Sequence, residues 1–253
     1  MYCWIDWGSD KLGEQETFYR RHLPHYQPTD ATFHVVFRLA GSLPSEIMEE
    51  MRIERAKAKR LLEQPKNQSE RRELLRQQHW DYFQRFDALL GAISTGPKWL
   101  KEDKIAELVK ETIHYRDGKE YDLFAYSIMP NHVHMVLELV GRVADPTLED
   151  NAQPKSLIGR DGPNPESSSG RDGVPSYALT NILTSLKKYT ALRANRLLGR
   201  SGAFWQNESY DHVIRDDGEL DRTIWYVLQN PVQAGLVSSW EEWPWNYCKW
   251  NPL

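Results

Sequence analysis

The sequence predicts an α+β sandwich in which helices back one antiparallel β-sheet, with a helical insertion after the first strand. Strand-forming and amphipathic helical segments alternate along the chain in the order β–α–β–β–α–β. The second and third strands are separated only by residues 129–131, a connection so short that the two strands must pair antiparallel. Together these observations favour a ferredoxin-like sandwich with a four-stranded antiparallel sheet.

Local residue patterns define each element. Residues 32–39 are β-branched and aromatic and end before a Gly–Ser–Leu–Pro turn, which is typical of a strand. Residues 101–114 and 177–198 carry apolar side chains at helical spacing, and Gly199 stands where a helix-terminating glycine belongs. The remaining elements are predicted as strands at 121–128, 133–139 and 209–214 and a helix at 219–229, ended by Asn230 and Pro231.

Two segments interrupt this pattern. Residues 45–92 are predicted to be a helical insertion, in which Pro65 forces a break near Glu63. Residues 47–80 contain nine Lys or Arg and six Asp or Glu, so we interpret the insertion as a solvated helical hairpin, with a DNA-contacting face as the alternative. Residues 145–176 are rich in Pro, Gly and Ser and predict a flexible linker or loop.

Composition excludes several classes of protein. The chain has 253 residues, of which 40% are apolar and 11% aromatic, and this predicts a packed core rather than disorder. Its apolar runs are only a few residues long, which excludes a membrane-spanning helix. Two cysteines are too few for a disulfide scaffold, and the first residues do not resemble a secretory signal, so we expect a cytoplasmic protein.

Two histidines on one predicted strand are candidate metal ligands. Side chains alternate along a strand, so His132 and His134 should project from one face while Val133 and Met135 enter the core from the other. Two imidazoles in this arrangement can bind one divalent cation. The alternative is a pair of exposed strand histidines without a ligand.

The helix at 177–198 is a candidate DNA-binding element. From residue 177 to residue 202 the chain carries basic residues and no acid, although its net charge is −4. Tyr189 lies at the edge of the apolar stripe of this helix. The alternative is a solvated basic surface with a boundary tyrosine. The basic residues are Lys187, Lys188, Arg193, Arg196 and Arg200.

The segment after this helix combines small, aromatic and polar residues. Phe204, Trp205 and Gln206 follow Gly199–Gly202, and such a loop can stack unpaired bases. The alternative is a pair of core aromatic residues beside the helix end.

Several motifs together resemble the single-tyrosine HUH transposases, and among them the REP-associated tyrosine transposases. The resemblance spans nearly the whole chain except the 145–176 segment, so residues 1–253 are expected to form a single HUH transposase-like domain. The motifs lie at residues 19–26, 96–100, 126–134, 188–190, 202–206 and 230–237.

The resemblance implies an enzyme and its site. His132 and His134 are expected to bind Mg²⁺ or Mn²⁺, and Tyr189 is expected to be the nucleophile. The implied activity is that of a metal-dependent single-stranded DNA nuclease and strand transferase that acts at hairpins of repetitive extragenic palindromes (REP) through a 5′-phosphotyrosine intermediate. The expected partner is single-stranded DNA with a hairpin, bound by a monomer or a homodimer without a membrane.

One position departs from the family pattern. Relatives complete the metal site with a carboxamide or an acidic residue one turn after the tyrosine, and Arg193 stands there in this chain. A guanidinium cannot bind a cation, so the third ligand stays open. The candidates considered are Glu138, Glu208 and His212.

Two other functions are consistent with these residues. A hairpin-binding protein with little or no turnover would agree with Arg193 in the ligand position. A zinc hydrolase is disfavoured, because no third strong ligand stands at the required spacing.

Overall fold

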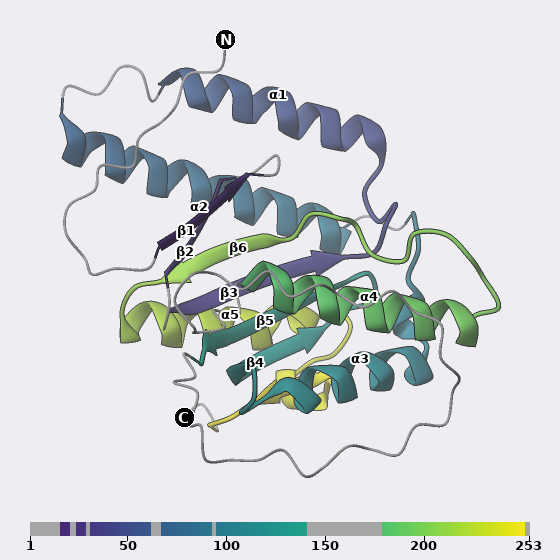
Figure 1. The fold of residues 1–253 in the computed structure, drawn as a ribbon. Helices are drawn as coiled ribbons and strands as arrows, with labels where there is room; N and C mark the ends of the chain where they lie inside the picture. Colours follow the sequence, from purple (N-terminus) through teal and green to yellow (C-terminus); the bar gives the residue numbers. More distant parts are fainter. Residues whose placement is uncertain are drawn as a thin grey trace, which may run out of the picture.

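The computed structural model describes residues 16–20, 24–28, 31–61, 67–92, 95–140 and 179–250 (Figure 1). Its centre is a five-stranded, fully antiparallel sheet in the order β6-β3-β5-β4-β7. The strands are β3 (Thr32–Arg38), β4 (Tyr121–Ile128), β5 (His132–Leu139), β6 (Tyr210–Ile214) and β7 (Asn246–Cys248).

The four predicted strands are present, and their order is that of a ferredoxin-like sheet. The predicted strand number is corrected by β7, which pairs with β4 through residues 125–127 only. Three residues are too few to show a period-two pattern, so the sequence carries no signal for this strand. Two further strands, β1 (Glu16–Arg20) and β2 (Pro24–Pro28), form a separate antiparallel pair that was also not predicted.

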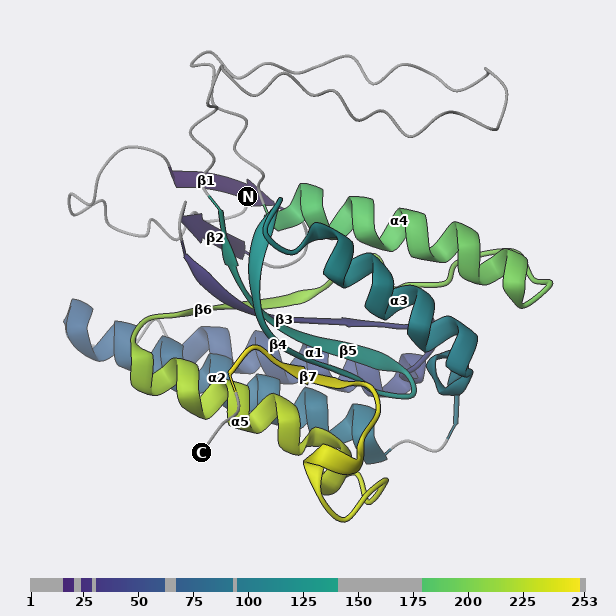
Figure 2. The same cartoon turned by 90° about the horizontal axis from the view of Figure 1, so that it is seen from below.

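Helices cover both faces of the sheet. Figure 2 shows α3 (Asp103–Arg116) and α4 (Leu179–Leu197) on one face, with α2 (Gln68–Ala92) and α5 (Asp217–Gln233) on the other. The outer helix α1 (Ser45–Leu61) packs against α2. Two single-turn 3₁₀ helices, η1 (Trp99–Lys101) and η2 (Trp240–Glu242), complete the described elements.

Side chains on β5 alternate between the two faces as predicted. Val133, Met135 and Leu137 join the main core, to which α3 and α4 contribute. Val136, on the other face, packs against residues of α5. His132 and His134 share the face of Val136 by the same alternation, so they point toward the layer formed by α2 and α5.

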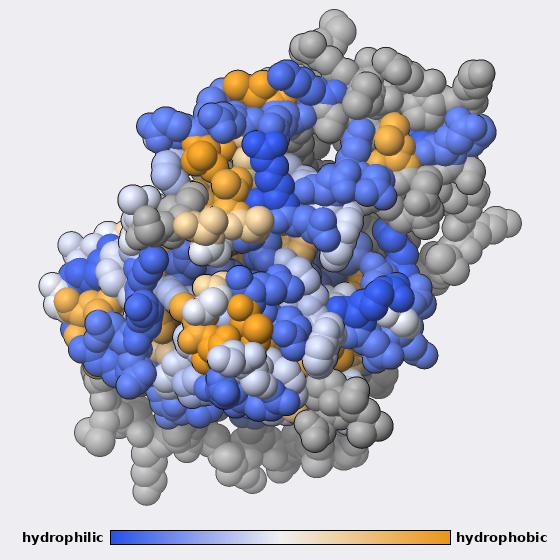
Figure 3. Space-filling model, turned by 180° about the vertical axis from the view of Figure 1, so that it is seen from behind, coloured by the Kyte–Doolittle hydropathy of each residue, from blue (hydrophilic) through white to orange (hydrophobic). Residues whose placement is uncertain are grey.

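The inserted segment forms α1 and α2, as its composition predicts. The break predicted at Pro65 and the linker predicted at 145–176 both lie outside the described residues. None of the described helices is long and apolar enough to cross a membrane. Figure 3 shows a face on which apolar residues form small patches among hydrophilic ones.

Helix α5 extends beyond its predicted end, because Pro231 lies inside the helix rather than after it. The helix continues to Gln233 and is closed by Gly235, whose φ of 66° is easy only for glycine. The amide of Leu236 donates to the carbonyl of Pro231, and that of Gly235 to Val232, which is the Schellman pattern. The proline is therefore accommodated within the last turn of a helix that ends at a glycine.

Candidate active site

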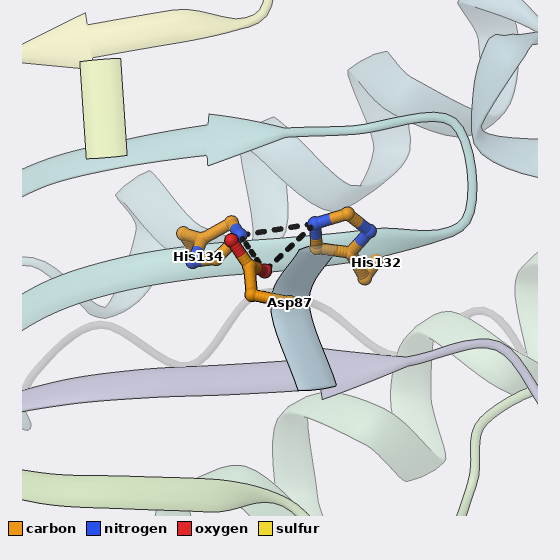
Figure 4. Close-up of side chains that lie close together, drawn as sticks. All are labelled: Asp87, His132 and His134. Atoms are coloured by element: carbon orange, nitrogen blue, oxygen red, sulfur yellow. Dashed lines mark hydrogen bonds and ion pairs between the residues drawn. The ribbon is translucent and has the colours of Figure 1, made fainter. Parts of the chain in front are cut away.

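Three side chains from two elements converge beneath α2. Asp87 lies on α2, and His132 and His134 lie on β5 (Figure 4). Oδ1 of Asp87 is 3.1 Å from Nε2 of His134 and 3.7 Å from Nε2 of His132. The two Nε2 atoms are 2.9 Å apart. We call these three residues the triad.

The triad is withdrawn from solvent, since the exposed fractions of Asp87, His132 and His134 are 6%, 1% and 0%. Burial, with a further contribution from His134, lowers the pKa of His132 to about 3, so its imidazole is neutral at pH 7. Burial alone would raise the pKa of Asp87, but the adjacent histidines and a hydrogen bond from Tyr226 hold it well below its usual range. Asp87 is therefore a carboxylate at neutral pH.

The outer nitrogens of both histidines have partners. Nδ1 of His132 lies 2.7 Å from Oδ1 of Asn131, whose amide nitrogen donates to the carbonyl of Leu90. Nδ1 of His134 lies 3.2 Å from Nε2 of His34 on β3. When each Nδ1 carries the proton for these bonds, both Nε2 lone pairs face Asp87.

This donor set fits a divalent cation. The three ligand atoms lie within 4.8 Å of one another, and Oδ1 of Asp87 is buried without a hydrogen-bond partner. Two imidazole nitrogens and a carboxylate oxygen would repel one another unless a proton or a cation lay among them. A nitrogen–oxygen set of this kind suits transition metals such as Mn²⁺ better than an all-oxygen site would.

A tyrosine that the sequence analysis did not select lies at the triad. The hydroxyl of Tyr226, on α5, donates a hydrogen bond to Oδ2 of Asp87. Its ring centroid is 6.1 Å from that of His134. Burial and the neighbouring Asp87 carboxylate raise the pKa of Tyr226. One turn later the buried Asn230 donates its amide to the Tyr226 carbonyl, with a nitrogen–oxygen distance of 3.2 Å.

The structure does not bring Tyr189 to this place. Tyr189 lies on α4, which packs on the opposite face of the sheet from the triad (Figure 2). Its side chain is 43% exposed, and its hydroxyl accepts a hydrogen bond of 3.1 Å from Arg193. Within one chain, the sheet therefore separates the predicted nucleophile from the predicted metal ligands.

The basic residues of α4 divide into two groups. Lys188, Arg193 and Arg196 have exposed side chains, and those of Lys188 and Arg196 extend from the helix toward solvent. Lys187 donates to the carbonyl of Gln206 at 2.9 Å, and Arg200 donates to the carbonyl of Ala203 at 3.1 Å. The second group therefore stabilises the loop that follows the helix.

Trp205 and Gln206 belong to the internal structure rather than to an open stacking surface. Trp205 is 6% exposed, its indole nitrogen donates to Thr190 at 2.8 Å, and its ring meets Phe37 edge to face. Phe204 is 1% exposed, and the amide of Gln206 donates to the carbonyl of Arg38. In this fold the aromatic pair fills the core and offers no ring face to an unpaired base.

The three acidic or imidazole residues considered for the third ligand lie outside the triad. His212 is bonded to Glu219 at the start of α5, with Nε2 and Oε1 2.7 Å apart. Glu138 lies further along β5, beyond Val136, and Glu208 lies in the loop before β6. Asp87 supplies the acid instead. No sequence signal singles it out, because acids are frequent throughout the insertion.

Comparison with known proteins gives one significant relative by sequence. No protein-family model matches this chain. Over 127 residues the chain is 25% identical to a protein of Haemophilus influenzae described as a REP-associated tyrosine transposase. The chain is a relative of the REP-associated tyrosine transposases. The match covers 50% of this chain and 58% of the relative, so the activity of the whole relative comes to this chain only as a proposal.

One solved structure has a similar outline. It is a REP-associated tyrosine transposase bound to a REP hairpin, and it aligns with 93% of this transposase relative and 82% of its own chain. The sequence identity is 14% and the TM-score is 0.43, a likeness too distant for a comparison of sites. The resemblance expected from the motifs is thus confirmed by the sequence relative.

Proposed function

We propose that this chain is a metal-dependent single-stranded DNA nuclease and strand transferase that acts at REP hairpins through a 5′-phosphotyrosine intermediate. The observation that carries the proposal is the hydrogen bond between the hydroxyl of Tyr226 and Asp87, which places a potential nucleophile beside a potential metal centre. The related transposase supports the choice of DNA as the substrate.

The proposed metal ligands are Asp87, His132 and His134, and the metal is Mg²⁺ or Mn²⁺. A bound divalent cation would offset the negative charge that develops on a phosphodiester during attack. The residues of the chain do the rest. His34 and Asn131 hold the two imidazoles by their Nδ1 atoms. The two oxygens of Asp87 face different groups, Oδ1 the histidines and Oδ2 the tyrosine hydroxyl.

The proposed nucleophile is Tyr226. Its phenolic oxygen forms a bond to phosphorus, and the bond from phosphorus to the 3′ oxygen breaks. The phenol loses a proton, and the leaving oxygen gains one to become a free 3′-hydroxyl. The phosphate stays on Tyr226, attached to the 5′ end of the cut strand, so the same steps in reverse can join that end to another 3′-hydroxyl.

Tyr226 also satisfies the family pattern that Tyr189 does not. The expected carboxamide one turn after the tyrosine is Arg193 for Tyr189 but Asn230 for Tyr226. A nucleophilic role for Tyr189 within one chain would require α4 to leave the sheet face on which it packs. Tyr189 therefore stays a prediction that the experiment below tests beside Tyr226.

The test is covalent capture. The chain is incubated with Mn²⁺ and a labelled single-stranded DNA that carries a hairpin, and the product is digested and mapped by mass spectrometry. We expect the DNA adduct on the peptide that contains Tyr226, its loss in Tyr226→Phe, and its retention in Tyr189→Phe. An adduct on Tyr189, or cleavage without any adduct, would reject the assignment of Tyr226.

A second candidate function is hairpin binding with little turnover. It is favoured by the burial of the triad beneath α2, since a phosphodiester reaches the two histidines only if α2 moves away from the sheet. Tight hairpin binding without cleavage at saturating Mn²⁺ would select this function.

A further inference from the structure

A buried arginine lies beside the triad. Arg38 is the last residue of β3 and stands directly opposite His132 in the antiparallel register. Directly opposed residues project from the same face of a sheet, so Arg38 extends toward the layer of α2, as His132 does. Its guanidinium lies 5.8 Å from the ring centroid of Phe86, the residue before Asp87 on α2.

Arg38 is 5% exposed, and it forms no ion pair with any residue that the structure describes. Its hydrogen-bond partners are neutral. Nη1 donates to the hydroxyl of Ser42 at 3.1 Å, and Nη2 points at the sulfur of Met48 at 3.3 Å. Burial lowers its pKa, and the electrostatic effects of Tyr82 and Glu208 offset this only in part.

Such an arrangement is unfavourable for folding alone. A buried charge is normally paired, and an apolar side chain of similar volume is often at least as stable in its place. A guanidinium carries five donors in a planar fork that matches the oxygens of a phosphate. A hydroxyl and a thioether sulfur leave most of that capacity unused.

We propose that Arg38 is a phosphate-binding residue that holds a phosphodiester of the DNA strand beside the triad. A phosphate oxygen would take the positions of the Ser42 hydroxyl and the Met48 sulfur around the guanidinium, once the α1–α2 hairpin makes room. This inference rests on the proposed function, because it places DNA at the triad. It adds a residue that neither the basic helix nor the tyrosines include.

The first test measures DNA affinity without metal and therefore without cleavage. Fluorescence anisotropy is recorded with a labelled hairpin that has single-stranded flanks, selected on the wild-type chain, in the presence of EDTA. We expect Arg38→Met to weaken binding by about tenfold or more, the value of a charge-assisted hydrogen bond. Arg38→Lys keeps the charge without the fork and should lie between. The control Arg52→Met, at a 72% exposed arginine of α1, should bind within about twofold of wild type.

The second test identifies the phosphate and separates recognition from folding. Each flanking phosphate of the hairpin is replaced in turn by a neutral methylphosphonate. We expect one linkage whose replacement weakens binding to wild type and leaves binding to Arg38→Met unchanged, since the same contact has already been removed. We expect the melting temperature of Arg38→Met to equal or exceed that of wild type.

Each contrary result has a distinct meaning. Equal affinity of wild type and Arg38→Met overturns the inference and leaves the proposed function intact. An equal loss by Arg38→Met on every oligonucleotide, together with a lower melting temperature, assigns Arg38 a structural role and overturns it as well. If wild type binds no hairpin at all, the proposed function fails and the inference fails with it.

Discussion

The Tyr226 hydroxyl on α5 donates a hydrogen bond to the Asp87 carboxylate on α2, and 139 residues of sequence separate the two. The contact joins the inserted hairpin to the last long helix directly over the two strand histidines. It makes Asp87 a shared partner, with one oxygen toward the histidines and the other toward the tyrosine.

Loss of this hydroxyl should destabilise the fold. In Tyr226→Phe, Oδ2 of Asp87 keeps its charge but loses its buried donor, which costs about 1–3 kcal/mol of unfolding free energy. Urea denaturation at pH 7 measures the loss. Tyr189→Phe is the control, because an exposed tyrosine should change the unfolding free energy by less than about 0.5 kcal/mol. Equal stability of both variants would contradict a structural role for the hydrogen bond.

The two strand histidines should be needed for stabilisation by metal. Saturating Mn²⁺ should raise the melting temperature of wild type and have no effect on His132→Ala or His134→Ala. Both variants should also melt lower than wild type without metal, because both side chains are buried. His114→Ala, at a half-buried histidine bonded to Tyr126, should keep the Mn²⁺ response. A full response in either triad variant would exclude that histidine as a ligand.

Asp87 should be the third ligand rather than an acid in or after the sheet. Asp87→Asn preserves the volume but removes the charge, so the rise in melting temperature with Mn²⁺ should shrink or vanish. Glu138→Gln and Glu208→Gln are matched controls, since both residues were considered for this role and neither belongs to the triad. An unchanged response in Asp87→Asn, with a loss in either control, would transfer the ligand role.

Trp205→Ala should act on folding rather than on DNA stacking. The indole is buried, bonded to Thr190 and packed on Phe37, so its removal should cost about 3–5 kcal/mol of unfolding free energy. Trp225→Ala, at a 49% exposed tryptophan, should cost far less. A stable Trp205→Ala chain that loses only DNA affinity would restore the stacking role predicted from the sequence.

The Glu219 carboxylate should make stability depend on acid pH. Burial raises its pKa, but the hydrogen bonds from His212 and from the Arg215 amide outweigh this and leave the pKa below its ordinary value. Because the folded pKa is depressed, the stabilisation is present above the unfolded pKa of about 4.3 and is lost as pH falls through the folded value. The difference in unfolding free energy between wild type and Glu219→Gln should therefore be largest near neutral pH and diminish below about pH 4. A constant difference across this range would contradict the assignment.

Local patterns predicted most of the sheet. The short connection at 129–131 required β4 and β5 to be antiparallel, and period-two alternation placed His132 and His134 on one face. These features depend only on neighbouring residues. The burial of the same histidines does not, because α2 covers them from a segment 40 to 65 residues earlier in the chain.

The rest of the candidate site depends on tertiary packing. Asp87 is one acid among many in a charged helix, and only the docking of α2 distinguishes it. Tyr226 carried a local signal, the Asn230 that follows it by one turn, but the basic surroundings of Tyr189 directed attention to α4. Trp205 and Phe204 follow a helix end, and composition does not distinguish a core aromatic pair from a stacking loop.

The placement of the triad on two separate elements couples cation binding to the position of the inserted hairpin. A cation held by all three ligands fastens α2 to β5, and at a free concentration of 100 times its dissociation constant it stabilises that docked state by about 2.7 kcal/mol. By thermodynamic reciprocity, anything that lifts α2 from the sheet weakens cation binding by the same factor. A DNA strand that enters beneath α2 must then replace, with its own phosphate oxygens, the coordination that Asp87 gives up, so strand and helix compete for one cation.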